Sequence, residues 1–379
     1  MATFTGTAKN DTFAGTAGAD IMAGLAGNDT YTVNHCDDVV TESPANGTDT
    51  VNASVSFTLP DDVEILVLTG AGAIDGTGND QDNLLVGNGG PNLITTGKGN
   101  DTVKAGGGDD VLVLGADLTI LDSLDGGAGI DTLRLDGDYT GMVFASTTLT
   151  NVEKIALADS GSYVMQFSDA NNTGGLLIDG SLLTGPNRVF IDASLETSSA
   201  LTAIGGSGVD IMAGGAGNDL LIGGANGDLL VGNGGVDTVS YEGSSAGVTI
   251  DLSVNAQGGG GDGKGDYLAG IENVIGSANN DKLSGDAGNN RLSGGAGNDT
   301  LTASAGNDVL LGEDGDDAIN LGANLTTADD IDGGDGSDTL VLAGNYAAGF
   351  SFGTKLRNIE TIALGAGFEA TRIEATGPK

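Results

Sequence analysis

The stretch GGSGVDIMAGGAGNDLLIGGANGDLLVGNGGVDTVS, residues 205–240, decides the fold. An aspartate returns in it every nine residues, and an apolar residue stands two positions after each aspartate. Sixteen Asp or Asn residues, in four blocks of the chain, keep this relation: Asp11, Asp20, Asp29, Asn83, Asn92, Asp101, Asp110, Asp210, Asp219, Asp228, Asp237, Asp281, Asn290, Asp299, Asp308 and Asp317. The residues two positions later are Phe13, Met22, Tyr31, Leu85, Ile94, Val103, Leu112, Met212, Leu221, Leu230, Val239, Leu283, Leu292, Leu301, Leu310 and Ile319.

A nine-residue unit of this composition predicts a tight turn followed by a very short strand. It is too short for a helical hairpin, and each interior glycine costs a helix roughly 1 kcal/mol relative to alanine. Glycine suits the turn because it adopts positive φ without a Cβ clash. The apolar residue then points inward from the strand. One unit cannot bury that residue alone, so the sequence predicts an all-β solenoid of stacked units.

The units GGSGVDIMA (205–213), GGAGNDLLI (214–222) and GGAGNDTLT (294–302) resemble the RTX or haemolysin-type calcium-binding nonapeptide, GGxGxDxUx. The resemblance implies a right-handed parallel β-roll in which two nonapeptides make one coil. Calcium then lies between turns on the same side, so each unit is paired with the second one along, eighteen residues away.

Carried onto this chain, the resemblance implies calcium ligands at the sixteen Asp and Asn positions. Asp131 and Asp338, in the similar units GGAGIDTLRL (126–135) and GGDGSDTLVL (333–342), complete the expected set. About eight sites are expected within the blocks, in the pairs Asp11–Asp29, Asn83–Asp101, Asn92–Asp110, Asp210–Asp228, Asp219–Asp237, Asp281–Asp299, Asn290–Asp308 and Asp299–Asp317. Calcium takes six to eight hard oxygen ligands, and a neutral amide oxygen should give a weaker site than a carboxylate. Asp and Asn also favour turns on their own, but that preference does not explain the constant phase.

The blocks alternate with segments of ordinary strand character. We expect β-roll blocks at 1–32, 76–114, 205–240 and 276–320, with strand spacers at 33–75 and 241–275, a strand module at 115–204, and its second, shortened copy at 321–379. An apolar residue followed by Glu and further apolar residues recurs in these spacers, as in VEILVL (63–68), and NVEKIAL (151–157) returns as NIETIAL (358–364) with an offset of 207. The shortened copy fits either a fragment of a longer protein, which we favour, or a terminal cap.

Charge restricts the partners. The formal net charge is −40, with 53 acidic against 13 basic residues. Nucleic acid and anionic membrane surfaces are therefore disfavoured, and cations are favoured. No apolar stretch reaches the length of a membrane span, and the single cysteine, Cys36, excludes an internal disulfide. The amino terminus lacks the pattern of a cleavable signal peptide. The resemblance implies type I secretion through an uncleaved carboxyl-terminal signal, and thus an extracellular or cell-surface protein.

Catalytic motifs fail on inspection. His35 is the only histidine, so the zinc-protease motif HExxH is absent, and its neighbour Cys36 is interpreted as part of a strand edge rather than of a soft-metal site. GSSAG (243–247) matches GxSxG only formally, because no helix is expected after Ser245. GGGGDG (258–263) predicts a flexible loop.

We therefore expect a secreted calcium-binding solenoid without catalysis of its own, in a structural, adhesive or secretion-assisting role, with cell-surface or matrix components as candidate partners. The alternative is the carboxyl-terminal region of an RTX protease, lipase or epimerase whose catalytic domain lies outside this chain. A carbohydrate-binding module is disfavoured because the chain has no Trp, six Tyr and nine Phe. The sequence does not predict an oligomeric state.

Substituting Asp299 by alanine should weaken two calcium sites, because Asp299 pairs backward with Asp281 and forward with Asp317. Asn83→Ala should weaken at most one site, which is already the weaker kind. Calorimetric calcium titration of both variants is the measurement, and equal losses would contradict a coil made of two repeats.

Overall fold

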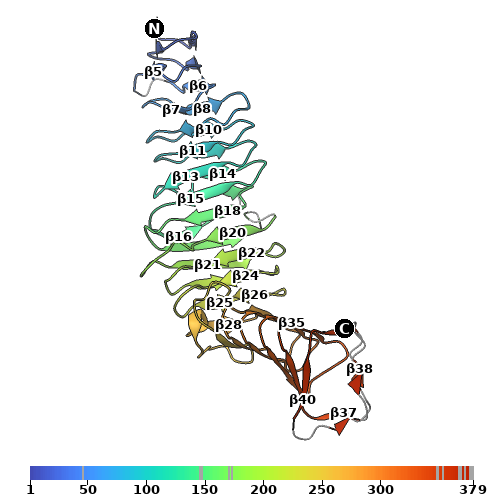
Figure 1. Ribbon diagram of the computed structural model, residues 1–379. Helices are drawn as coiled ribbons and strands as arrows, with labels where there is room; N and C mark the ends of the chain where they lie inside the picture. The colour runs from blue at the N-terminus through green and yellow to red at the C-terminus, as the bar shows by residue number, and fades with distance from the viewer. Residues whose placement is uncertain are drawn as a thin grey trace. The chain divides into compact units, whose positions relative to one another are not determined.

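The computed structural model describes the chain except residues 45–46, 145–147, 170, 172–173, 347–349, 352–353, 366–368, 371–372 and 375–379. It forms two compact units, Met1–Leu182 and Leu183–Lys379. In the described residues the secondary structure is almost entirely strand, with one short 3-10 helix at Gly261–Gly263. Each unit is a parallel β-solenoid, which confirms the predicted fold class (Figure 1).

In the first unit, parallel strands stack in rows as the chain winds. One row contains β2 (Thr12–Ala14), β4 (Thr30–Val33), β6 (Thr50–Ala53), β8 (Ile65–Leu68), β10 (Leu84–Val86), β12 (Thr102–Lys104), β14 (Ser123–Asp125) and β17 (Leu149–Thr150). A second row contains β7 (Phe57–Thr58), β9 (Gly76–Thr77), β11 (Leu93–Thr95), β13 (Val111–Gly115), β15 (Thr132–Leu135), β18 (Lys154–Leu157) and β20 (Leu176–Asp179). Shorter rows contain β1 (Ala2–Thr5), β3 (Asp20–Ala23) and β5 (Val39–Thr41), and the pair β16 (Tyr139–Val143) and β19 (Tyr163–Ser168).

The second unit has the same construction. Its longest row contains β22 (Leu201–Ile204), β24 (Leu220–Ile222), β26 (Thr238–Ser240), β29 (Asn273–Ile275), β31 (Arg291–Ala296), β33 (Val309–Asp314), β35 (Asp330–Asp335) and β39 (Leu356–Arg357). Two further rows contain β21 (Val189–Leu195), β23 (Ile211–Ala213), β25 (Leu229–Val231) and β28 (Tyr267–Ala269), and β27 (Thr249–Asp251), β30 (Lys282–Ser284), β32 (Thr300–Thr302), β34 (Ala318–Gly322), β36 (Thr339–Leu342) and β40 (Thr361–Leu364). Two short pairs join β37 (Asn345–Tyr346) to β41 (Glu369–Ala370) and β38 (Phe350–Ser351) to β42 (Ile373–Glu374).

The register of the rows gives the length of one turn. In the nonapeptide blocks a strand pairs with the residue eighteen positions on, as Leu84 does with Thr102. Elsewhere a turn takes between 15 residues, from Thr50 to Ile65, and 38 residues, from Leu229 to Tyr267. The strands of the expected spacers therefore lie in the same rows as those of the expected blocks, and the loops absorb the differences in length.

The module that recurs with an offset of 207 has the same elements in both copies. Strands β13, β14, β15, β17 and β18 of the first copy correspond to β34, β35, β36, β39 and β40 of the second, each displaced by 207 residues at its first position. The three extra residues in the turn after β13 also recur, because Val111 pairs with Thr132 as Ala318 pairs with Thr339. Similar sequence thus produces the same local winding in both units.

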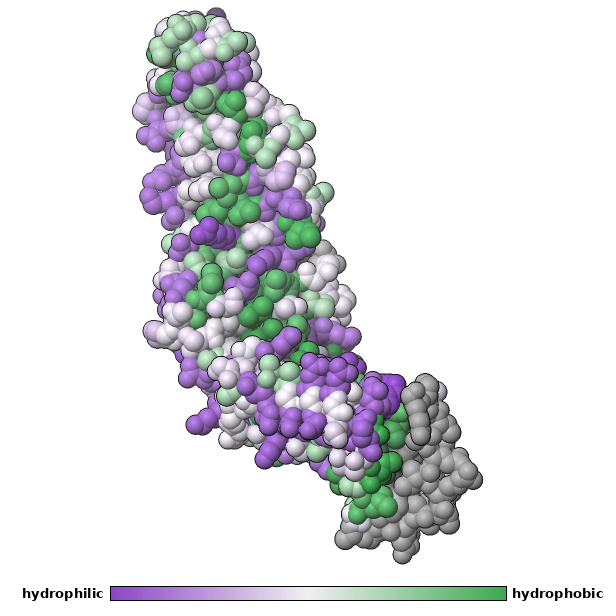
Figure 2. All heavy atoms as spheres, viewed as in Figure 1, coloured by the Kyte–Doolittle hydropathy of each residue, from purple (hydrophilic) through white to green (hydrophobic). Residues whose placement is uncertain are grey.

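The core is a column of inward-pointing side chains. All sixteen apolar residues that the nine-residue phase placed inside are at most 7% exposed. Because the same position returns one turn later, like stacks on like, as Phe13 does on Tyr31 with 5.1 Å between ring centroids. The outward residues of the short strands are mixed, and Figure 2 shows apolar patches among strongly hydrophilic ones on the visible face.

Truncating an inward residue should cost far more than truncating an outward one of the same type. Leu301 is fully buried and Leu195 is 57% exposed. Leu301→Ala should lower the free energy of unfolding by about 2–5 kcal/mol because it leaves a cavity in the column. Leu195→Ala should change it by less than about 0.5 kcal/mol. Urea unfolding of the calcium-loaded chain, followed by circular dichroism, measures both, and equal effects would contradict the inward phase.

Candidate metal centres between successive turns

Each acidic position stands immediately before a strand and is joined to the next turn by one hydrogen bond. The backbone N–H of Asp281 donates to Oδ1 of Asp299 at 2.8 Å, and that of Asp299 donates to Oδ1 of Asp317 at 2.7 Å. We call such a chain of bonds a carboxylate ladder. All eight expected pairs are joined in this way, with N···O distances of 2.6 to 2.9 Å.

The other expected positions lie in ladders too. Oδ1 of Asp131 accepts from the N–H of Asp110 at 2.8 Å, and Oδ1 of Asp338 accepts from that of Asp317 at 2.9 Å. Asp20 accepts from the N–H of Ala2 at 2.8 Å. Of the eighteen expected residues, all but the half-buried Asp11 are buried. The structure thus brings together the residues that the resemblance selected, on successive turns.

Five further aspartates continue these ladders although the nine-residue phase did not select them. They are Asp38, Asp49, Asp122, Asp266 and Asp329, which accept at 2.6 to 2.9 Å from the backbone N–H groups of Asp20, Asp29, Asp101, Asp228 and Asp308. Each stands two residues ahead of a buried apolar residue, as Asp49 does before Val51. That local signal is present in the sequence, but irregular turn lengths remove these residues from the phase.

Four glutamates occupy the same position in the spacers. Oε2 of Glu64, Glu153, Glu272 and Glu360 accepts at 2.8 Å from the N–H groups of Asp49, Asp131, Asp237 and Asp338, respectively. Each glutamate directly precedes a strand, as Glu64 precedes β8. The recurring apolar-Glu motif of the spacers therefore supplies the acceptor that aspartate supplies in the blocks.

The second carboxylate oxygen distinguishes two kinds of turn. In a closed turn it accepts from the N–H of the residue four positions earlier, as Asp210 does from Gly206 at 2.9 Å and Asp219 from Gly215 at 2.8 Å. In an open turn it is buried and has no hydrogen-bond partner among the described residues. The open set contains Asp29, Asp110, Asp131, Asp228, Asp237, Asp299, Asp317 and Asp338.

Backbone conformation separates the two kinds of turn. In every open turn the residue four positions before the aspartate has positive φ, namely Leu25, Gly106, Gly127, Gly224, Asn233, Gly295, Glu313 and Gly334. Gly206 and Gly215, in closed turns, do not belong to the positive-φ residues. The left-handed conformation thus coincides with the loss of the hydrogen bond to Oδ2. A buried charged oxygen without a donor is costly.

Close approach to glycine completes the cradle around this oxygen. A Cβ built on Gly223 would overlap Oδ2 of Asp228, and one built on Gly294 would overlap Oδ2 of Asp299. The first glycine of the nonapeptide is therefore required for space, because the carboxylate lies directly against its Cα. Unpartnered carboxylate oxygens beside a glycine-rich turn fit a hard cation such as calcium.

The ladders carry charge that the protein does not neutralise. Ion pairs in the described part of the chain involve Asp37, Asp80, Asp179, Asp330 and Asp332, none of which belongs to a ladder. Burial, together with neighbouring carboxylates, raises the pKa of Asp228 to about 8 and that of Asp299 to about 7. Desolvation therefore outweighs the hydrogen bonds that these groups accept, and the calcium-free fold disfavours their ionised forms.

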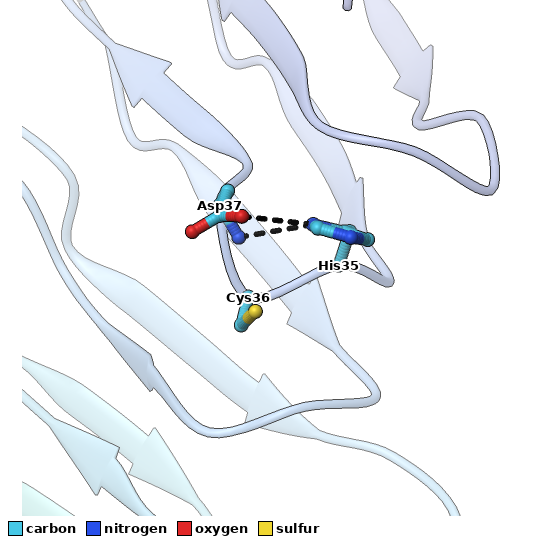
Figure 3. Close-up of side chains that lie close together, drawn as sticks. All are labelled: His35, Cys36 and Asp37. Atoms are coloured by element: carbon cyan, nitrogen blue, oxygen red, sulfur yellow. Dashed lines mark hydrogen bonds and ion pairs between the residues drawn. The ribbon is translucent and has the colours of Figure 1, made fainter.

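The remaining sequence motifs form no comparable site. His35, Cys36 and Asp37 lie in the turn between β4 and β5, so the expected strand-edge position is wrong. Figure 3 shows the His35 ring beside Asp37, whose backbone N–H donates to Nδ1 at 3.2 Å, while Cys36 points elsewhere. GSSAG leads into strand β27 and not into a helix. No helix within the described ranges has the length and apolar character needed to cross a membrane.

Comparison with known families selects the same segments. The chain matches the family model of the RTX calcium-binding nonapeptide repeat over residues 3–31, 77–116, 204–239, 268–301, 293–324 and 326–343. The last matched segment contains Asp329 and Asp338 and extends beyond the expected block at 276–320. No curated protein matches the chain.

Without calcium, acid should stabilise the fold. The raised pKa values mean that the folded chain holds more protons than the unfolded chain above the ordinary aspartate pKa of 3.8. This contribution is complete below about pH 4 and is lost as the pH rises through about 6 to 8. In EGTA the β signal in circular dichroism should therefore grow as the pH falls from 8 to 5. Asp228→Asn should flatten the part of the curve above pH 7, and a β signal that grew with rising pH would contradict the uncompensated ladder.

Proposed function

From the RTX calcium-binding nonapeptide repeats that this chain contains, we propose that the protein binds calcium ions between successive turns of its solenoid and folds as it binds them. The observation that carries this proposal is the set of eight buried carboxylate oxygens without a hydrogen-bond partner in the described residues. Each needs a positive charge in place of the missing donor. Bound calcium would supply that charge together with room for six to eight oxygen ligands.

The proposed ligands are the eighteen ladder residues that the sequence selected, in about eight sites within the blocks. The open turns favour a metal most, because a closed turn already satisfies both carboxylate oxygens. Asn83, Asn92 and Asn290 contribute a neutral oxygen and are proposed as the weaker members of their pairs. The off-phase aspartates, such as Asp122 and Asp329, extend the proposed sites beyond the blocks.

Coupling of folding to calcium suits a protein that acts outside the cell. With a net charge of −40 the calcium-free chain repels itself, and ligands that meet only in the folded state couple binding to folding. Low calcium inside the cell would keep the chain extended for export, and high calcium outside would fold it. We propose a secreted or cell-surface protein with a structural, adhesive or secretion-assisting role and no catalysis of its own. The expected carboxyl-terminal secretion signal lies mostly outside the described residues.

The alternative function, the carboxyl-terminal region of an RTX exoenzyme, shares the same calcium-dependent fold. It differs in requiring a catalytic domain in the same polypeptide. The coding sequence on either side of this segment in the genome separates the two, and a protease, lipase or epimerase domain in frame with it would favour the exoenzyme.

Calcium, and neither magnesium nor salt, should fold the chain. Magnesium demands near-octahedral geometry at about 2.0–2.1 Å and gives up water reluctantly, whereas these turns offer irregular oxygen cages. Sodium screens the repulsion between carboxylates without bridging successive turns. The test is circular dichroism and protease resistance after EGTA treatment, followed by addition of calcium, magnesium or sodium chloride. Recovery of the same β signal and protease resistance with magnesium or with salt would reduce the ladders to a solvated acidic surface.

A further inference from the structure

The repeat pattern is broken in the turn after β5 by a glutamate. In the register of β3 and β5, Ala23 pairs with Thr41, so Glu42 stands one turn beyond Gly24. Gly24 is the first glycine of its nonapeptide, GLAGNDTYT (24–32). A charged side chain therefore occupies a position that the repeat reserves for glycine.

Glu42 meets two ladder aspartates. One carboxylate oxygen from each of Asp29, Glu42 and Asp49 lies within 4.8 Å of the other two. Asp29 is 1% exposed and Asp49 is 3% exposed, whereas Glu42 is half-buried. None of the three takes part in an ion pair in the described part of the chain. Three acidic groups thus share one small volume without a protein cation.

The unpartnered oxygen of Asp29 faces this volume. Its Oδ1 belongs to the ladder and accepts from the N–H of Asp11 at 2.6 Å, but its Oδ2 has no hydrogen-bond partner among the described residues. A Cβ built on Gly24 would touch both Oδ2 of Asp29 and Oε1 of Glu42, so these two oxygens converge over the same glycine. The arrangement lacks only a positive charge.

Tyr31 fixes the glutamate from the core side. Its ring is fully buried and stacks on Phe13, and its hydroxyl donates a hydrogen bond to Oε1 of Glu42. The other oxygen, Oε2, accepts from the backbone N–H of Ser43 at 3.2 Å. These contacts hold the Glu42 carboxylate against the solenoid instead of leaving it in solvent.

We propose that Asp29, Glu42 and Asp49 form a separate calcium site with a ligand set that the nonapeptide does not provide. All three donors are oxygens, which favours a hard divalent cation over zinc or copper. Three carboxylates in place of the two of a regular Asp pair give this site more negative charge, and calcium affinity rises with the number of charged ligands. The site is therefore filled at lower calcium concentration than the regular pairs. This inference deepens the proposed function and rests on it.

Counting bound calcium in the full chain is the first test. Glu42→Gln should bind one calcium ion fewer than the wild type in equilibrium dialysis, and the loss should fall in the tightest step of a calorimetric titration. The matched control is Glu242→Gln, which removes the same charge from an exposed turn. Wild-type chain that bound no calcium would refute the proposed function itself. Wild-type chain that bound calcium, with Glu42→Gln unchanged in number and affinity, would overturn only this site.

Terbium luminescence gives a second, local readout. Terbium replaces calcium at oxygen sites and emits when a nearby tyrosine is excited, and Tyr31 touches this site through Glu42. At low terbium-to-protein ratio the tyrosine-sensitised emission should fall several-fold in Tyr31→Phe, which keeps the three carboxylates and the stacked ring. The number of calcium ions bound should stay the same in that variant. Unchanged emission in Tyr31→Phe would place the first ion elsewhere and overturn the inference, even if Glu42→Gln failed to fold.

Discussion

The hydrogen bond from a backbone N–H to a carboxylate one turn later is the interaction on which the rest of this structure depends. It occurs at the same point of each turn, immediately before the strand, and it fixes an acidic residue inside the solenoid. A hydrogen bond to a charged group contributes about 1.5–3 kcal/mol, but the shifted pKa of Asp228, to about 8, shows that burial opposes ionisation more strongly. Since the fold supplies no basic partner to the ladders, its architecture creates a demand for external cations.

Phase and core were predictable from sequence because both are set by the strands, which keep one register throughout. The sixteen inward residues follow from a single period. The ladder members that escaped prediction lie where turn length changes, so that Asp49 and Asp122 are 20 and 21 residues beyond their partners Asp29 and Asp101. Glutamate escaped for a different reason. Glu64 reaches the N–H of Asp49 from only 15 residues away, so neither its spacing nor its residue type matched the repeat.

Which turns are open could not be predicted from residue type. Glycine stands four positions before both Asp219 and Asp228, yet only Gly224, before Asp228, has positive φ. Leu25, Asn233 and Glu313 adopt the same left-handed conformation although they carry side chains. The conformation is strained for such residues, and it exposes no donor to the buried oxygen. The strain persists because the neighbouring turns and strands hold the backbone in place, and that depends on the assembled solenoid.

Asparagine shows how a ladder begins without a cation. In Asn290 the amide oxygen accepts from the N–H of Asp286 at 2.9 Å, and the amide nitrogen donates to the carbonyl of Glu272, one turn back, at 3.0 Å. Asn92 makes the corresponding bonds to Asn88 and Ile74. A carboxylate in this place would have no proton to donate to that carbonyl, so the amide alone satisfies both neighbours. These neutral groups stand near the start of a block, the unpartnered carboxylates follow them, and glutamates of the spacers accept the final N–H. Demand for calcium is thus concentrated in the interior of each ladder by the choice among three side chains that share one acceptor position.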